Sequence, residues 1–110
     1  MPGKITIVAS DQELYRFRYQ SQSGESILEG APRPSKSRAL EDADAFRRGV
    51  SEDGRYHVSR DLNGRFYFHF LGECGEELAV SAAYPTPEGL GQAIALLKAC
   101  APKAALDDRA

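Results

Sequence analysis

The feature that most constrains this chain is internal self-similarity, because a shift of 51 positions lays its second half over its first without a gap. Gly24 then meets Gly75, and Pro34 meets Pro85. The aromatic residues coincide as well: Tyr15, Phe17 and Tyr19 meet Phe66, Phe68 and Phe70. A repeated unit of this size cannot bury its own apolar face, so we expect two units to share a core. We predict one domain, 1–110, made of repeats 3–53 and 54–104 with a short C-terminal tail.

Each half carries the same order of predicted elements. Alternation of apolar and polar residues indicates strands, first around Ile5 and Ile7, then along the aromatic positions. A third, shorter strand is expected near Ile27, and Ser35 and Thr86 are expected to cap two helices with apolar stripes. The predicted fold class is therefore α+β. It consists of two pseudo-symmetric strand-strand-strand-helix(-strand) repeats that share one antiparallel sheet, with both helices packed on one face.

Several local motifs resemble those of the YegP-like family of small bacterial domains of unknown function, in its tandem-repeat form. The segment 93–102, AIALLKACAP, is similar to the family's Gly-Ile-x-x-Val-Lys-x-Asn-Ala-Pro helix end. The segment 81–84, SAAY, resembles the family's Ser-Glu-x-Tyr, although Ala82 replaces the glutamate. The segment 34–36, PSK, resembles its Ser-Lys helix start.

This resemblance covers nearly the whole chain and implies a fold without implying a reaction. It implies two units joined in one antiparallel sheet, with their last strands exchanged between the halves. By that analogy, residues 55–59 close the first unit and open the second, and residues 104–106 close the second. From the residues alone, the tail 104–108 is either a short last strand or frayed.

Composition and charge exclude several classes of protein. The chain has 110 residues and a net charge of −2, so no bulk field attracts nucleic acid or anionic lipid. No apolar stretch approaches the ~18 residues of a membrane-spanning helix, and the first apolar run is too short for a signal peptide. Cys74 and Cys100 match no redox or metal motif, which favours reduced thiols. We expect a cytoplasmic protein that does not contact a membrane.

The residues that commonly carry chemistry form no recognisable site. His57 and His69 lie on predicted strands, where a metal would need further ligands that the spacing does not supply. Neighbouring residues on a strand point to opposite faces, so Glu76 and Glu77 are a poor acid–base pair. We therefore predict no catalytic residue, no metal and no cofactor. Whether the protein is an enzyme stays open, and a non-enzymatic role is favoured.

The candidate binding surface is the sheet face opposite the helices. It would carry Arg16, Arg18, Tyr67 and His69, with Arg33 and Tyr84 in the loops that precede the helices. Such a face is either an ordinary solvated surface, a platform for single-stranded nucleic acid or an anion, or a protein contact. The function is thus unknown. We favour a small non-enzymatic binding or protein-interaction module, with an unknown protein or small ligand as its partner, over a nucleic-acid binder. We expect a monomer with internal pseudo-two-fold symmetry.

Overall fold

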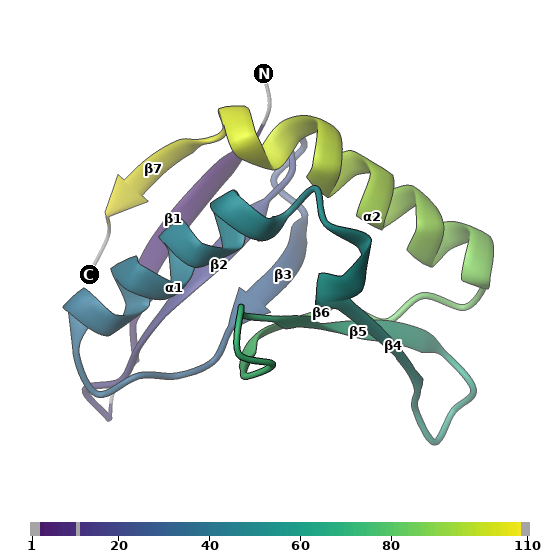
Figure 1. Cartoon of the computed structure of the whole chain (residues 1–110), viewed down its shortest axis with the longest axis horizontal. Helices are drawn as coiled ribbons and strands as arrows, with labels where there is room; N and C mark the ends of the chain where they lie inside the picture. The colour runs from purple at the N-terminus through teal and green to yellow at the C-terminus, as the bar shows by residue number, and fades with distance from the viewer. Residues whose placement is uncertain (1–2, 11, 109–110) are drawn as a thin grey trace.

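The aromatic positions lie on two strands, β2 and β5, of one sheet that is covered on one face by two helices, and β3 and β6 lie between these strands (Figure 1). The computed structural model describes residues 3–10 and 12–108, so the outermost residues of the predicted domain 1–110 lie outside it. The elements are, in chain order, β1 (Lys4–Ala9), β2 (Tyr15–Gln20), β3 (Ser26–Gly30), α1 (Lys36–Gly49), the 3-10 helix η1 (Asp53–Arg55), β4 (Tyr56–Arg60), β5 (Phe66–Leu71), β6 (Glu77–Ser81), α2 (Pro87–Cys100), the 3-10 helix η2 (Ala101–Lys103) and β7 (Ala105–Asp108).

The sheet is mixed, which corrects the prediction of a wholly antiparallel one. Its strand order is β4-β5-β6-β3-β2-β1-β7, and every neighbouring pair except the last runs antiparallel. β7 pairs parallel to β1, with Ala105 opposite Lys4. The physical reason is the path of the chain: after η2 it enters the sheet at the end where β1 begins, so the two strands share a direction. The tail is therefore a strand through Asp108.

Corresponding elements of the two halves lie 51 residues apart. α1 begins at Lys36 and α2 at Pro87, β2 begins at Tyr15 and β5 at Phe66, and β3 and β6 follow the same spacing. The repeat boundaries 3–53 and 54–104 remain a prediction. The halves differ at the ends of the sheet, since β7 lies beside β1 while β4 is a terminal strand.

Local sequence sets where the helices begin. The Ser35 side chain accepts a hydrogen bond from the backbone N–H of Arg38, and the Thr86 side chain accepts one from that of Gly89. Each bond satisfies a donor that the first helical turn leaves without a partner, which confirms the two expected caps. Pro87 fits the first turn of α2 because the N–H that it lacks has no acceptor there.

The core is built from rings between the sheet and the helices. Phe17, Tyr19, Phe68 and Phe70 are fully buried, whereas Tyr15 and Phe66, at the strand starts, are only partly buried. Phe46 of α1 is also fully buried and connects the two halves: its ring centroid lies 5.5 Å from that of Phe17 and 5.0 Å from that of Phe70. The helices thus pack on the aromatic face of the sheet, as the alternation predicts. Within the described residues, neither helix has the length and apolar character needed to cross a membrane.

Removing the ring that joins the halves should cost more stability than any exposed apolar truncation. We expect Phe46→Ala to lower the free energy of unfolding by about 3–5 kcal/mol, because it leaves a cavity in a closely packed core. Urea denaturation followed by circular dichroism measures this loss. The matched control, Leu62→Ala at a fully exposed position, should change stability by no more than about 0.5 kcal/mol. Equal losses in the two variants would contradict the packing described here.

Stability should also fall in alkaline solution. Burial and, secondarily, the Asp53 carboxylate raise the pKa of Tyr56 above its ordinary value, and the Tyr56 hydroxyl donates a hydrogen bond to the Val50 carbonyl. The folded chain therefore holds this proton more tightly, so its contribution is complete below about pH 10 and is lost as the pH rises further. Urea denaturation at several alkaline pH values should give a steeper decline for the native chain than for Tyr56→Phe. Parallel declines would show that Tyr56 is not the group responsible.

Candidate functional site

Arg16 and Arg18, the cations predicted for the uncovered sheet face, both form ion pairs with the Glu29 carboxylate. The Arg18 guanidinium donates to the Glu29 carboxylate over 2.7 Å, and Arg16 lies 3.8 Å from the second oxygen of the same group. Glu29 reaches them because it is the direct cross-strand partner of Arg18 in the β2–β3 pair. This part of the face is a compact network of two cations and one anion. It leaves less positive charge for a phosphate backbone than the two arginines suggest.

Rings gather at the β4–β5 end of the same face. His57 of β4 is the direct cross-strand partner of His69 of β5, with ring centroids 6.1 Å apart. Tyr67 meets the His69 ring edge to face at 5.2 Å, and His69 Nδ1 contacts the Glu77 carboxylate. We call His57, Tyr67 and His69 the ring cluster. The sequence prediction omitted His57 from this surface. A two-residue Asn63-Gly64 turn would place His57 opposite Phe70, whereas the observed turn pairs Asp61 with Arg65 and places it opposite His69.

Arg33 and Tyr84 do not join the other predicted residues. Their backbones form isolated bridges with Tyr15 and Phe66, at corresponding places in the two halves. The Arg33 guanidinium donates to the Asp42 carboxylate of α1 over 2.5 Å, on the helix side of the sheet. Tyr84 has Ala93 at the position that corresponds to Asp42, and its hydroxyl oxygen is buried without a partner among the described residues. Burial, and then the Glu25 charge, raise the pKa of Tyr84 above its ordinary value. The six predicted residues thus occupy separate places.

The β4–β5 hairpin also exposes apolar side chains outside the ring cluster. Val58 pairs with Phe68, lies on the face opposite the ring cluster and is 52% exposed, and Leu62, at the tip, is fully exposed. The turn is held by the Asp61 carboxylate, which accepts hydrogen bonds from the N–H groups of Asn63 and Arg65, each at 2.9 Å. Figure 1 shows this hairpin extending away from both helices. We call the ring cluster together with Val58 and Leu62 the hairpin surface.

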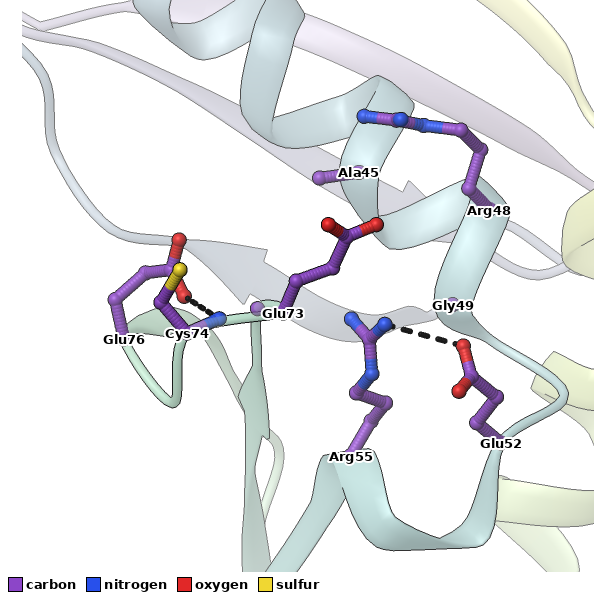
Figure 2. Close-up of a pocket in the computed structure, with 9 residues that line it drawn as sticks. Ala45, Arg48, Gly49, Glu52, Arg55, Glu73, Cys74 and Glu76 are labelled. Atoms are coloured by element: carbon purple, nitrogen blue, oxygen red, sulfur yellow. Dashed lines mark hydrogen bonds and ion pairs between the residues drawn. The ribbon is translucent and has the colours of Figure 1, made fainter.

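A small polar pocket lies on the helix side, between the end of α1, η1 and the β5–β6 turn (Figure 2). Its volume is about 190 Å³, below the roughly 300 Å³ at which pockets for drug-sized ligands begin. Glu73 points into it between Arg48 and Arg55 (Figure 2). Arg55 is mostly buried, donates to Glu52 over 3.1 Å and donates to the Leu71 carbonyl over 3.4 Å. The main cation of this pocket therefore joins η1 to β5, which is a structural role.

Two further observations bear on chemistry. A wider hollow of about 730 Å³ lies between the β2–β3 turn and β7, but its cation, Lys4, lies 3.7 Å from the Asp107 carboxylate that also lines it. Within residues 3–10 and 12–108, no cluster of three or more histidine, cysteine, aspartate or glutamate side chains could hold a metal ion. Cys74 is exposed beside Glu76, whose carboxylate accepts a hydrogen bond from the Cys74 backbone N–H and does not contact its thiol as a base would.

Comparison with known proteins supports the fold and assigns no activity. No protein-family model matches the sequence. The chain is 24% identical over 108 residues to UPF0339 protein PA0329 of Pseudomonas aeruginosa, covering 98% of each chain. It is 27% identical over 99 residues to UPF0339 protein YegP of Escherichia coli, covering 90% of each.

Two solution NMR structures have the same fold. The structure of yegP from E. coli, described as a protein of unknown function, has a TM-score of 0.92 at 26% identity and covers 99% of this chain and 94% of that one. The structure of UPF0339 protein SO3888 from Shewanella oneidensis has a TM-score of 0.91 at 18% identity, covering 98% of this chain and 92% of that one. The second likeness shows the fold alone.

The separate environments of Arg33 and Tyr84 give a paired prediction. Asp42→Asn should lower the free energy of unfolding by about 2 kcal/mol, because it weakens a partly buried, charge-assisted hydrogen bond to Arg33. Tyr84→Phe should leave stability unchanged or raise it, since the lost hydroxyl has no partner in the described part of the chain. Urea denaturation of both variants makes the comparison. A large loss in Tyr84→Phe would mean that its hydroxyl has a structural partner.

Proposed function

Because the chain is homologous to the UPF0339 proteins, whose function is unknown, we propose a function from its own surface. We propose that it is a small non-enzymatic module that binds a protein partner through the hairpin surface. The observation that carries this proposal is the exposure of apolar side chains there. Of the three exposed large apolar residues in the described chain, Val58 and Leu62 lie on this one hairpin, Val58 on the face opposite the ring cluster and Leu62 at the tip. Aromatic and apolar side chains that are uncovered together are typical of protein contacts.

A nucleic-acid or anion platform is the second candidate, and the ring cluster favours it because bases stack on such rings. The charge arrangement supports it less. Arg16 and Arg18 share the Glu29 carboxylate, and the chain has a net charge of −2. A protein partner needs no phosphate-binding charge and also accounts for the exposed Val58 and Leu62, which offer a nucleotide neither a charge nor an aromatic ring.

We further propose that the protein is a cytoplasmic monomer. Its two cysteines, Cys74 and Cys100, are free thiols, which agrees with a reducing compartment. The shared core supports the monomer, since the two halves bury each other's rings within one chain.

Photo-crosslinking tests the proposed surface directly. A photoreactive amino acid at Leu62 should give a discrete adduct in a lysate of the source organism, and the adduct should resist nuclease and be degraded by protease. The matched control carries the same group at Gln92, an exposed position on α2, and should give no such adduct. Replacing the ring cluster, as His57→Ser with Tyr67→Ser, should weaken the adduct at Leu62.

Two results would contradict the proposal. A nuclease-sensitive adduct at Leu62 would favour the nucleic-acid alternative. Equal adducts at Leu62 and Gln92 would show that the hairpin is not a specific contact surface.

A further inference from the structure

The two ends of the sheet differ in a way that exposes one strand edge. At one end, β7 lies along β1; at the other, β4 pairs with β5 and has no neighbouring strand on its outer side among the described residues (Figure 1). Ile7 of β1 and Val58 of β4 occupy corresponding positions, 51 residues apart. Ile7 is fully buried, whereas Val58 is 52% exposed. Ile7 has β7 on its outer side, whereas Val58 has no further strand on its outer side in the described part of the chain.

The backbone of β4 offers hydrogen bonds along this edge. In an antiparallel pair, successive residues point their N–H and C=O groups alternately toward and away from the partner strand. Asp61 N–H bonds to the Arg65 carbonyl, so Val58 and Arg60 belong to the set that points away from β5. No partner for the Val58 or Arg60 backbone groups lies among the described residues outside the sheet. These groups are the usual contacts for an added strand.

The charge along the edge favours an acidic segment over a second copy of the same strand. β4 contains His57 and Arg60 and no acidic residue. The Arg60 guanidinium lies over the Phe66 ring at 5.2 Å, and neither it nor Arg65 has a carboxylate within ion-pair distance in the described chain. Two β4 edges paired together would bring no acidic residue of β4 to Arg60 or Arg65. An acidic segment would meet these cations instead.

The other end of the sheet shows how such a segment is held. β7 has the sequence ALDD: Leu106 lines a small pocket with Ile5 and Leu40, and Asp107 lies 3.7 Å from Lys4. The apolar Leu106 and the acidic Asp107 thus each meet a residue of β1, on opposite faces of the sheet. At β4, Val58 and Arg60 lie on one face, so an apolar residue of an added strand would meet Val58 and an acidic residue two positions away would meet Arg60.

We propose that β4 accepts an extended segment of a partner protein as an eighth strand, and that this segment places acidic residues next to an apolar one. The inference rests on the proposed function, because it specifies the protein partner of the same hairpin. Backbone hydrogen bonds to Val58 and Arg60 would supply the pairing. Val58 would supply the apolar contact, and Arg60 and Arg65 would supply the selectivity for acidic residues.

The test uses a synthetic peptide with the sequence of residues 103–108, KAALDD, added to the isotope-labelled full chain. Nuclear magnetic resonance titration should shift the amide signals of Val58 and Arg60 and leave those of Ile5 and Ile7 unchanged, because β7 already occupies that edge. The same peptide with Asp107→Asn and Asp108→Asn should bind at least about threefold more weakly. An unstructured oligodeoxythymidine should not shift the β4 amides.

Two variants of one residue separate the strand edge from the side chain. Val58→Pro removes the outward N–H and should abolish peptide binding, while pairing with β5 is retained. Val58→Thr keeps the N–H and the branched side chain and should bind within about twofold of the native chain. A native-like spectrum for each variant establishes that it is folded. If Val58→Pro does not fold, Arg60→Glu serves instead and should weaken binding of the acidic peptide at least about threefold.

Specific outcomes would overturn the inference. These are the absence of β4 shifts, equal binding of the Asp and Asn peptides, shifts caused by oligodeoxythymidine, and concentration-dependent β4 shifts of the chain alone, which would make a second copy the occupant. The inference and the proposed function fail separately. Peptide binding without a protein adduct at Leu62 would refute the proposed function alone. A protein adduct that survives Val58→Pro, without peptide binding, would refute strand addition alone.

Discussion

The structure depends on the contact of one ring with rings from both halves of the chain. Phe46 leaves α1 and packs between Phe17 of β2 and Phe70 of β5, and all three side chains are fully buried. Rings of this size contribute the largest apolar areas that a small domain buries. Neither half has this contact without the other, because α1 belongs to the first half and Phe70 to the second. The single sheet and the single core follow from it.

The two ends of the sheet differ in their terminal strands, β7 at one end and β4 at the other. The strands that carry the core rings, β2 and β5, are each covered by a helix and flanked on both sides. The chain continues after α2 and adds β7 beside β1, whereas after α1 it passes through η1 directly into β4. The second end therefore receives no extra strand. The corresponding residues Ile7 and Val58 also differ strongly in burial, since the hairpin that carries Val58 extends away from both helices (Figure 1).

Much of the fold could be predicted because its signals are local. The alternation of rings, the proline-containing loops and the cap residues Ser35 and Thr86 each act over a few residues, and the structure bears out the elements they indicate. The parallel pairing of β7 could not be predicted from pattern, since it depends on where α2 ends relative to β1. The family resemblance implied the exchange of the last strands within one antiparallel sheet, which is the wrong direction for β7.

The candidate site was less accessible to sequence reasoning because it depends on register. Glu29 neutralises Arg18 across a strand pair, eleven positions away, and nothing in the local sequence identifies that partner. Arg33 follows a strand and resembles a surface cation, yet it turns to Asp42 on the helix side. The contact of His57 with His69 also depends on register, because the turn pairs Asp61 with Arg65, one residue away from the register of a two-residue Asn63-Gly64 turn.

The most direct test of this account is amide hydrogen exchange of the uncomplexed protein at Ile7 and Val58, which occupy corresponding positions on the two terminal regions of the sheet. The account predicts that Ile7, covered by β7, exchanges at least about a hundredfold more slowly than Val58, whose N–H faces solvent. Equal protection at the two positions would mean that the edge of β4 is already covered, and would contradict the account.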